Sequence, residues 1–191
     1  MSEATLRWLV ESHAALAALC LEEPAGFRRL LGSALVDGLT GCLTYSRLRE
    51  VLAEESNRCR RHGHRLSCCF LDLDDFKRVN DLYGHPAGNR VLRIVGRALT
   101  EGVRSSDHVG RYGGDEFVVV LPEAGARHAA WLGRRLGSRI ARQTQDLAGE
   151  QITCSVGVCQ WDGSCSPDEL LARADEALAR AKQAGEPVAL D

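Results

Sequence analysis

The sequence predicts an α+β domain of the ferredoxin-like split order β-α-β-β-α-β, with a mainly antiparallel sheet and helices on one face. Two observations indicate the strands: an apolar run at residues 66–73, and two short apolar segments that flank Gly113-Gly114. A third observation, the helical spacing of apolar residues between these runs, indicates the helices. With 191 residues, of which 45% are hydrophobic, the chain is long enough to bury one core.

The remaining elements follow from the same periodicities. Helices are predicted at 45–61, 87–100, 126–143 and 167–184, and a further strand at 152–161. Two amphipathic helical patterns precede them, at 4–21 and 27–36, and the second ends at Asp37-Gly38. We therefore divide the chain into an N-terminal helical segment, 1–36, that packs, dimerises or signals, and a main domain, 37–191.

Charge and cysteine content narrow the possible partners. A formal net charge of -2 gives no general attraction to nucleic acid or anionic lipid, so any phosphate site is local. Cys68 and Cys69 are adjacent in an apolar run, which indicates reduced, buried thiols. The apolar stretch at 14–21 is shorter than the roughly 20 residues that cross a bilayer. We expect a cytoplasmic chain without a membrane span or a nucleic-acid partner.

Carboxylates follow the first strand directly. The apolar run at 66–71 leads into Asp72-Leu73-Asp74-Asp75. Asp74 or Asp75 is expected to cap the next helix. Asp72 lies on the strand itself, where a buried charge is costly unless a cation or hydrogen bonds compensate it.

A second acidic pair follows the Gly-Gly turn. Gly113 and Gly114 suit a tight hairpin, because glycine tolerates positive φ. Asp115 and Glu116 are poor strand formers at the start of an apolar strand, which indicates a site for an anion and a metal ion.

The two acidic segments suggest phosphoryl-transfer chemistry if their strands are neighbours. Asp72 and Asp115 would then share divalent cations, with Mg²⁺ the first choice and Mn²⁺ the alternative. Gly113 and Gly114 would let a nucleotide approach the backbone closely, and Lys77 would neutralise charge on its phosphates.

Residues 113–117, Gly-Gly-Asp-Glu-Phe, resemble the signature of the GGDEF family of diguanylate cyclases. Further family-like motifs occur in order at 37–41, 72–88, 155–157 and 174–182, so the resemblance covers about 37–185. It implies a palm-type nucleotidyl cyclase fold. It also implies condensation of two GTP into cyclic di-GMP with release of pyrophosphate, by two copies of the domain facing each other.

The resemblance also assigns roles within the site. Asp72, Asp115 and the main-chain carbonyl of Leu73 are expected to hold Mg²⁺, and Asp115 to accept the proton of the ribose 3'-hydroxyl. Glu116 assists, and Lys77 stabilises the transition state. The substrate-binding positions implied for the triphosphate, guanine and ribose are Lys182, Asn80, His85, Asn89, Gly113 and Gly114.

Arg104 and Asp107 stand where the family has an inhibitory site for its product. An arginine fork suits phosphates and guanine edges. A plain surface ion pair between the two side chains is the alternative.

Two positions depart from the family pattern. Asn89 replaces an aspartate that accepts two hydrogen bonds from guanine, which predicts either weaker guanine binding or relaxed base choice with a cyclic GMP-AMP product. Glu186 replaces an arginine near the phosphates, and Thr44-Tyr45 replaces Asn-Arg. A catalytically weak module that binds GTP or cyclic dinucleotide is the alternative function, and a polymerase-like or adenylyl-cyclase-like palm domain the more distant one.

Overall fold

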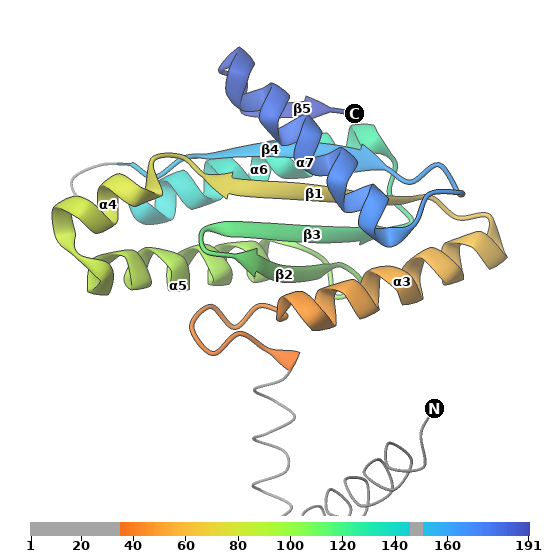
Figure 1. Ribbon diagram of the computed structural model, residues 1–191, viewed down its shortest axis with the longest axis horizontal. Helices are drawn as coiled ribbons and strands as arrows, with labels where there is room; N and C mark the ends of the chain where they lie inside the picture. The colour runs from red at the N-terminus through yellow and green to blue at the C-terminus, as the bar shows by residue number, and fades with distance from the viewer. Residues whose placement is uncertain (1–34, 146–150) are drawn as a thin grey trace, which may run out of the picture. The chain divides into compact units, whose positions relative to one another are not determined.

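The computed structural model describes residues 35–145 and 151–191 (Figure 1). Internal contacts divide the chain into Met1–Leu35 and Val36–Asp191, and the fold below is that of the second unit. The helices predicted at 4–21 and 27–36 lie almost wholly outside the described residues. The proposed role of segment 1–36 therefore stays a prediction.

Five strands form one sheet in the order β2-β3-β1-β4-β5. Their bounds are β1 Leu66–Leu73, β2 His108–Gly113, β3 Glu116–Pro122, β4 Cys154–Gln160 and β5 Val188–Leu190. The first four strands pair antiparallel, and β5 joins β4 in parallel. The predicted split arrangement and mainly antiparallel sheet are confirmed. The edge strand β5 was not predicted, because three residues are too few for a period of two to be visible.

Helices cover both faces of this sheet (Figure 1). The helices are α3 Tyr45–His62, α4 Phe76–Tyr83, α5 His85–Gly102, α6 Ala126–Thr144 and α7 Pro167–Ala184. One apolar cluster joins the sheet to α4, α5 and α6, and a second joins its other face to α3 and α7. The prediction that helices lie on one face only was wrong.

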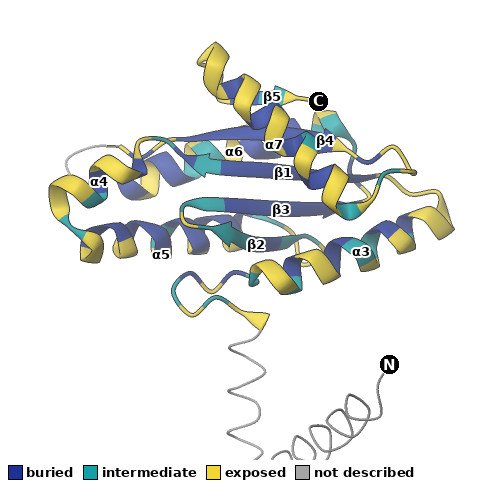
Figure 2. Cartoon of the chain, viewed as in Figure 1, coloured by how far each residue is buried: buried dark blue, intermediate teal, exposed yellow. Residues whose placement is uncertain are grey.

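Strand β1 shows why the sheet needs two layers of helices. Its first six residues are all buried (Figure 2), and from Cys68 to Leu71 they alternate between the two clusters. Cys69 and Leu71 face the α5–α6 side, whereas Cys68 and Phe70 face the α3–α7 side. A strand that is apolar at consecutive positions is typical of a sheet that is covered on both sides. The apolar run therefore carried this information in the sequence.

The segment after β1 forms a separate short helix, α4, that the sequence prediction missed. Asp75 holds its N-cap position with a left-handed φ of 53°, but its side chain makes no capping hydrogen bond. The side chain of Asp74 instead accepts hydrogen bonds from the hydroxyls of Thr153 (2.6 Å) and Ser155 (2.8 Å). Asp75 thus occupies the predicted N-cap position but lacks the side-chain hydrogen bond expected of a cap, and the Asp74 carboxylate is bound by the Thr153 and Ser155 hydroxyls instead.

The seven described cysteines are all free thiols, and six of them are buried. Burial raises the pKa of the Cys69 thiol to about 12, so this group stays protonated and unreactive. The prediction of reduced, mostly buried thiols is confirmed for these residues. No helix in the described part of the chain is both long and apolar enough to cross a bilayer.

Helix α7 begins with a capping box. The Ser166 hydroxyl accepts a hydrogen bond from the Glu169 N–H (3.2 Å), and the Glu169 carboxylate accepts one from the Ser166 N–H (2.7 Å). We expect Ser166→Ala to lower the free energy of unfolding by about 1 kcal/mol, because an orphan N–H loses its acceptor. Urea unfolding measures this loss, with Ser166→Thr as the control that keeps an acceptor. An equal loss in both variants would contradict a capping role.

Candidate functional site

Strand pairing brings the two predicted acidic segments together at one end of the sheet. Asp72, near the end of β1, lies opposite Glu116 at the start of β3, and opposite Ser155 on β4. Asp115 occupies the turn that precedes Glu116. The expectation that the two strands are neighbours is therefore met. Pairing of β1 with β3 brings the two acidic segments together, although they lie far apart in the sequence.

The β2–β3 turn is fastened to the start of the domain. The Arg111 guanidinium donates to the Gly114 carbonyl (3.0 and 2.7 Å) and pairs with the Asp37 carboxylate (3.2 Å). Gly114 has a left-handed φ of 46°, which only glycine adopts freely. Arg111 thus fixes the backbone on which Asp115 is carried.

Asp37 is held in its charged form by these contacts. Burial disfavours ionisation, but hydrogen bonds from the Thr40 N–H and hydroxyl, together with the Arg111 guanidinium, outweigh it and lower the pKa of this carboxyl. The family-like motif at 37–41 had no role assigned to it from the sequence. Its signal was an acidic residue beside a turn, with no indication of the distant arginine that binds it.

The acidic end of the sheet carries more negative charge than its neighbours neutralise. The Lys182 ammonium on α7 lies 2.7 Å from the Asp72 carboxylate. Burial and the Asp72 carboxylate nevertheless raise the pKa of Asp115. Burial and the charges of Asp72, Asp175 and Asp115 likewise raise the pKa of Glu116. The charged forms of Asp115 and Glu116 are thus destabilised, which favours the binding of a cation.

The donor atoms at this end suit a hard divalent ion. Carboxylate and carbonyl oxygens from Asp72, Asp115 and the Leu73 main chain match the ligands that Mg²⁺ prefers. Among the described residues, no three His, Cys, Asp or Glu side chains cluster closely enough to hold a metal ion. Asp72, Asp115 and the Leu73 carbonyl would supply only part of a ligand set, and substrate phosphates commonly complete Mg²⁺ sites of this kind.

Four of the residues predicted to contact the nucleotide, Lys77, Asn80, His85 and Asn89, lie on α4 and on the first turns of α5, which follow β1. Lys77 is exposed on α4, and His85 and Asn89 are exposed on α5. A Cβ atom at Gly88 would lie 2.1 Å from the Asn80 side-chain oxygen. Glycine at this position therefore lets Asn80 approach the turn of α5 that carries Asn89.

Arg104 and Asp107 lie in the loop between α5 and β2, at the opposite end of β2 from Gly113. The Asp107 carboxylate accepts a hydrogen bond from the Arg104 backbone N–H (2.9 Å), so it orders the loop and leaves the guanidinium exposed. Both residues line a cavity of about 320 Å³, together with Gly41, Leu43 and Thr100. The geometry favours an accessible arginine over the plain surface ion pair.

The fold and this acidic end define a palm-like α+β domain of the kind that serves nucleotidyl transfer. The family description "Diguanylate cyclase, GGDEF domain" matches residues 34–187, and the chain belongs to the GGDEF family.

Two relatives named as diguanylate cyclases resemble the chain over most of its length. The chain is 42% identical over 154 residues to the diguanylate cyclase DgcP of Pseudomonas aeruginosa, covering 80% of this chain and 23% of DgcP. It is 39% identical over 153 residues to the diguanylate cyclase DosC of Escherichia coli K12, covering 78% of this chain and 33% of DosC. The chain thus spans a third or less of these two relatives.

A solved structure supports the same placement. The GGDEF domain of DgcB from Caulobacter crescentus, crystallised in complex with c-di-GMP, superposes with a TM-score of 0.77 at 26% identity. The match covers 82% of this chain and 93% of the DgcB chain.

Removing one of the repelling carboxylates should stabilise the domain. Folding raises the pKa of the Asp115 carboxyl, so its ionised form lowers the stability of the folded domain. This cost is present at neutral pH and disappears as the pH falls toward the ordinary pKa of 3.8. We expect Asp115→Asn to raise the free energy of unfolding at neutral pH by up to about 1 kcal/mol without divalent ions, and to change it little near pH 4. Urea unfolding at both pH values measures this, and a variant less stable than the parent at neutral pH would contradict it.

Proposed function

We propose that this domain condenses two GTP molecules into cyclic di-GMP and releases pyrophosphate, as a Mg²⁺-dependent diguanylate cyclase. The observation that carries the proposal is the meeting of Asp72, Asp115 and Glu116 with Lys182 at one end of the sheet. The similarity of the chain to DgcP and DosC, both named as diguanylate cyclases, supports it. A cytoplasmic location, where GTP is available, is part of the proposal.

Asp72, Asp115 and the Leu73 carbonyl would hold Mg²⁺ or Mn²⁺. When bound, the ion would offset the charge of the triphosphate and polarise the α-phosphate for attack.

The chain's own residues would handle the proton and the phosphates. The raised pKa of Asp115 makes its carboxylate a stronger proton acceptor, which suits removal of the proton from the ribose 3'-hydroxyl. Glu116, with a pKa raised by the same surroundings, would assist in this pocket. Lys182 now pairs with Asp72 and would turn to the triphosphate, and Lys77 would stabilise charge in the transition state.

Asn80, His85 and Asn89 would contact the guanine and ribose, and Gly113 and Gly114 would let the nucleotide lie against the backbone. One domain binds one nucleotide in this scheme. A homodimer is therefore required, in which each 3'-hydroxyl attacks the α-phosphate held by the partner.

We also propose that Arg104 and Asp107 bind cyclic di-GMP as an inhibitor. The exposed guanidinium beside a cavity of about 320 Å³ supports this role. This cavity lies at the other end of β2 from the Gly-Gly turn, so product bound there would leave the acidic end open.

A second candidate function is a binding module with little turnover, and Asn89 and Glu186 favour it. Glu186 is exposed immediately after the α7 C-cap, so its charge would face the phosphates that Lys182 is proposed to contact. Repulsion there would weaken substrate binding.

Incubation of the purified chain with Mg²⁺ and GTP, ATP or both, followed by mass identification of the products, tests the proposal. Cyclic di-GMP is the expected product from GTP, and Asp115→Asn should abolish it. A mixed GMP-AMP product would instead make this a cyclase of relaxed base choice. Intact GTP binding without turnover at high protein concentration would contradict the enzyme and leave the binding module.

Asn89→Asp should strengthen guanine recognition. Aspartate accepts the two hydrogen bonds that guanine donates, whereas asparagine offers one acceptor and one donor, a difference on the order of 1–3 kcal/mol. We expect the KM for GTP to fall about tenfold or more. Steady-state kinetics with GTP and with ATP measure the change, and an equal effect on both nucleotides would contradict a contact to the base edge.

A further inference from the structure

Positive charge is concentrated on one face of the domain. Helices α5 and α6 pack against each other on the same side of the sheet, and the Arg139 guanidinium reaches across to Glu101 (2.5 Å). Their arginines are Arg90, Arg93, Arg97, Arg127, Arg134, Arg135, Arg139 and Arg142, and their one acidic residue is Glu101. Eight arginines against one glutamate leave seven positive charges here, although the whole chain has a net charge of -2. We call this surface the α5–α6 face.

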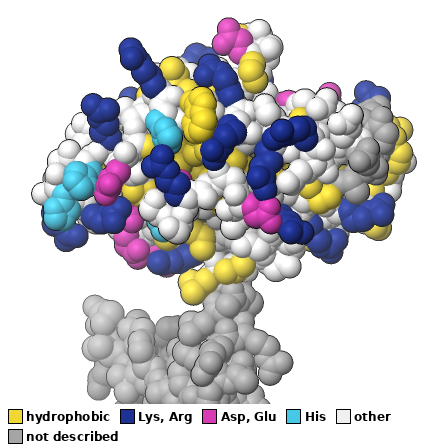
Figure 3. Space-filling view, turned by 180° about the vertical axis from the view of Figure 1, so that it is seen from behind, with side chains coloured by type: hydrophobic (Ala, Val, Ile, Leu, Met, Phe, Trp, Pro, Cys, Tyr) yellow, Lys and Arg dark blue, Asp and Glu magenta, His cyan; other side chains and the backbone are white. Residues whose placement is uncertain are grey.

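Several of these arginines are available to a partner. The Glu101 carboxylate, the one acidic side chain of these two helices, accepts hydrogen bonds from Arg97 (2.7 Å) and Arg139. It therefore neutralises none of the other arginines. Arg93, Arg134 and Arg142 are exposed, and none of them forms an ion pair within the part of the chain that the structure describes. Figure 3 shows this side of the molecule, where Lys and Arg side chains are spread widely and acidic ones are few.

An aromatic ring lies among these charges. Trp131 is 52% exposed, unusually far for a tryptophan in a domain with a well-filled core. It precedes Arg134 by three residues and follows Arg127 by four, so the three side chains share one stripe of α6. The Arg135 guanidinium lies 4.8 Å from the ring centre. A large apolar ring between cations is typical of surfaces that meet a membrane interface.

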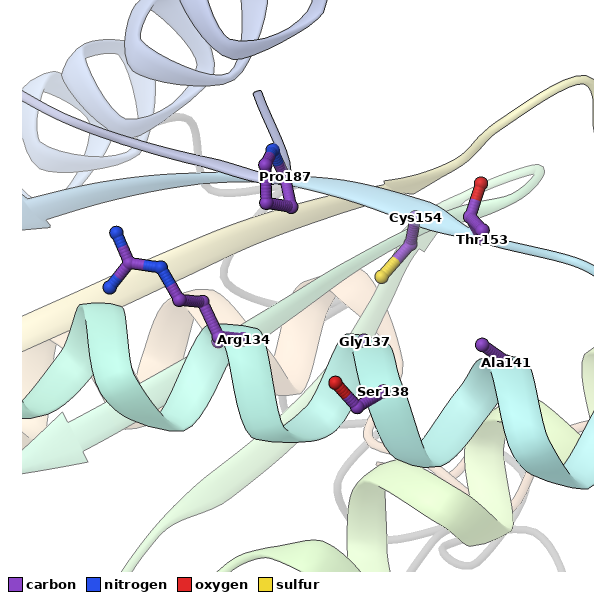
Figure 4. A pocket seen from close by; sticks show the side chains of 8 residues that line it. Arg134, Gly137, Ser138, Ala141, Thr153, Cys154 and Pro187 are labelled. Atoms are coloured by element: carbon purple, nitrogen blue, oxygen red, sulfur yellow. The ribbon is translucent and has the colours of Figure 1, made fainter. Parts of the chain in front are cut away.

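An apolar slot adjoins the arginines, between α6 and strand β4 (Figure 4). Its volume is about 330 Å³, and its lining residues are Gly133, Arg134, Gly137, Ser138, Ala141, Thr153, Cys154 and Pro187. Most of these are small or apolar, and Arg134 is the one charged residue among them. A slot of this kind beside a guanidinium suits an amphiphile with an anionic head and an apolar tail.

We propose that the α5–α6 face docks onto a membrane surface rich in anionic phospholipid. The arginines bind headgroup phosphates, Trp131 lies at the level of the headgroups, and the slot beside Arg134 accepts apolar lipid atoms. The charge extends over two adjacent helices, which matches a planar surface. A nucleic acid would use the same charge and could stack a base on Trp131, but it has no flexible aliphatic chain for the slot, so a lipid surface is favoured.

Sedimentation with phospholipid vesicles tests this proposal, which does not depend on the proposed enzyme activity. The full chain is mixed with vesicles of phosphatidylglycerol and phosphatidylcholine, or of phosphatidylcholine alone. Binding to the anionic vesicles is expected, and it should fall steeply as salt is added, because the contacts are electrostatic. Arg134→Gln combined with Arg142→Gln should weaken this binding at least tenfold.

A matched variant controls for net charge. Arg60→Gln combined with Arg61→Gln removes two exposed arginines from α3, on the other face of the sheet, and should change vesicle binding less than twofold. Circular dichroism checks that both variants fold, and Trp131→Ser, which keeps every charge, should also weaken binding. Equal loss in the two arginine variants, equal binding to both kinds of vesicle, or binding to single-stranded RNA but not to vesicles would overturn the proposal.

Discussion

Burial and the nearby Asp72 carboxylate disfavour the charged forms of Asp115 and Glu116, and the rest of the domain prevents these residues from separating. Antiparallel pairing of β1 with β3 places Asp72 opposite Glu116. Helices on both faces bury this pair of strands, so a one-residue slip would exchange side chains between the two packed cores and disrupt both. The free energy of the two cores thus holds together charges that water would otherwise keep apart. Natural proteins commonly accept such a local cost at a site that binds a cation.

Contacts from distant parts of the chain complete this arrangement. Arg111 ties the Gly114 carbonyl to Asp37, so the start of the domain supports the turn that carries Asp115. Helix α7, which begins at a capping box, presents Lys182 to Asp72 on the α3–α7 face of the sheet. The acidic end is therefore positioned by the first motif, the central strands and the last helix together, and a change in any of them is felt there.

The sequence was sufficient for most of the elements, though not for α4 or β5, and for the meeting of the two acidic segments, because glycines, carboxylates and apolar runs are local signals. The strand at 66–73 and the turn at Gly113-Gly114 lie where periodicity placed them. Features that depend on distant partners were not visible in this way. The Asp74 carboxylate accepts hydrogen bonds from the Thr153 and Ser155 hydroxyls instead of capping α4, and the Arg111–Asp37 pair joins residues 74 positions apart. The second layer of helices was encoded by the consecutive apolar residues of β1, whose alternation between two cores becomes clear only in three dimensions.

The most direct test of the account is a titration of the purified chain with Mg²⁺, following the midpoint of thermal unfolding at neutral pH. If the acidic end is an under-neutralised cation site, Mg²⁺ should raise the midpoint by several degrees in the parent chain and much less in Asp72→Asn. Buffer without divalent ions, at matched ionic strength, controls for general screening of charge. A midpoint that does not respond to Mg²⁺, or that responds equally in parent and variant, would contradict the assignment of Asp72 and its neighbours to a metal-dependent centre.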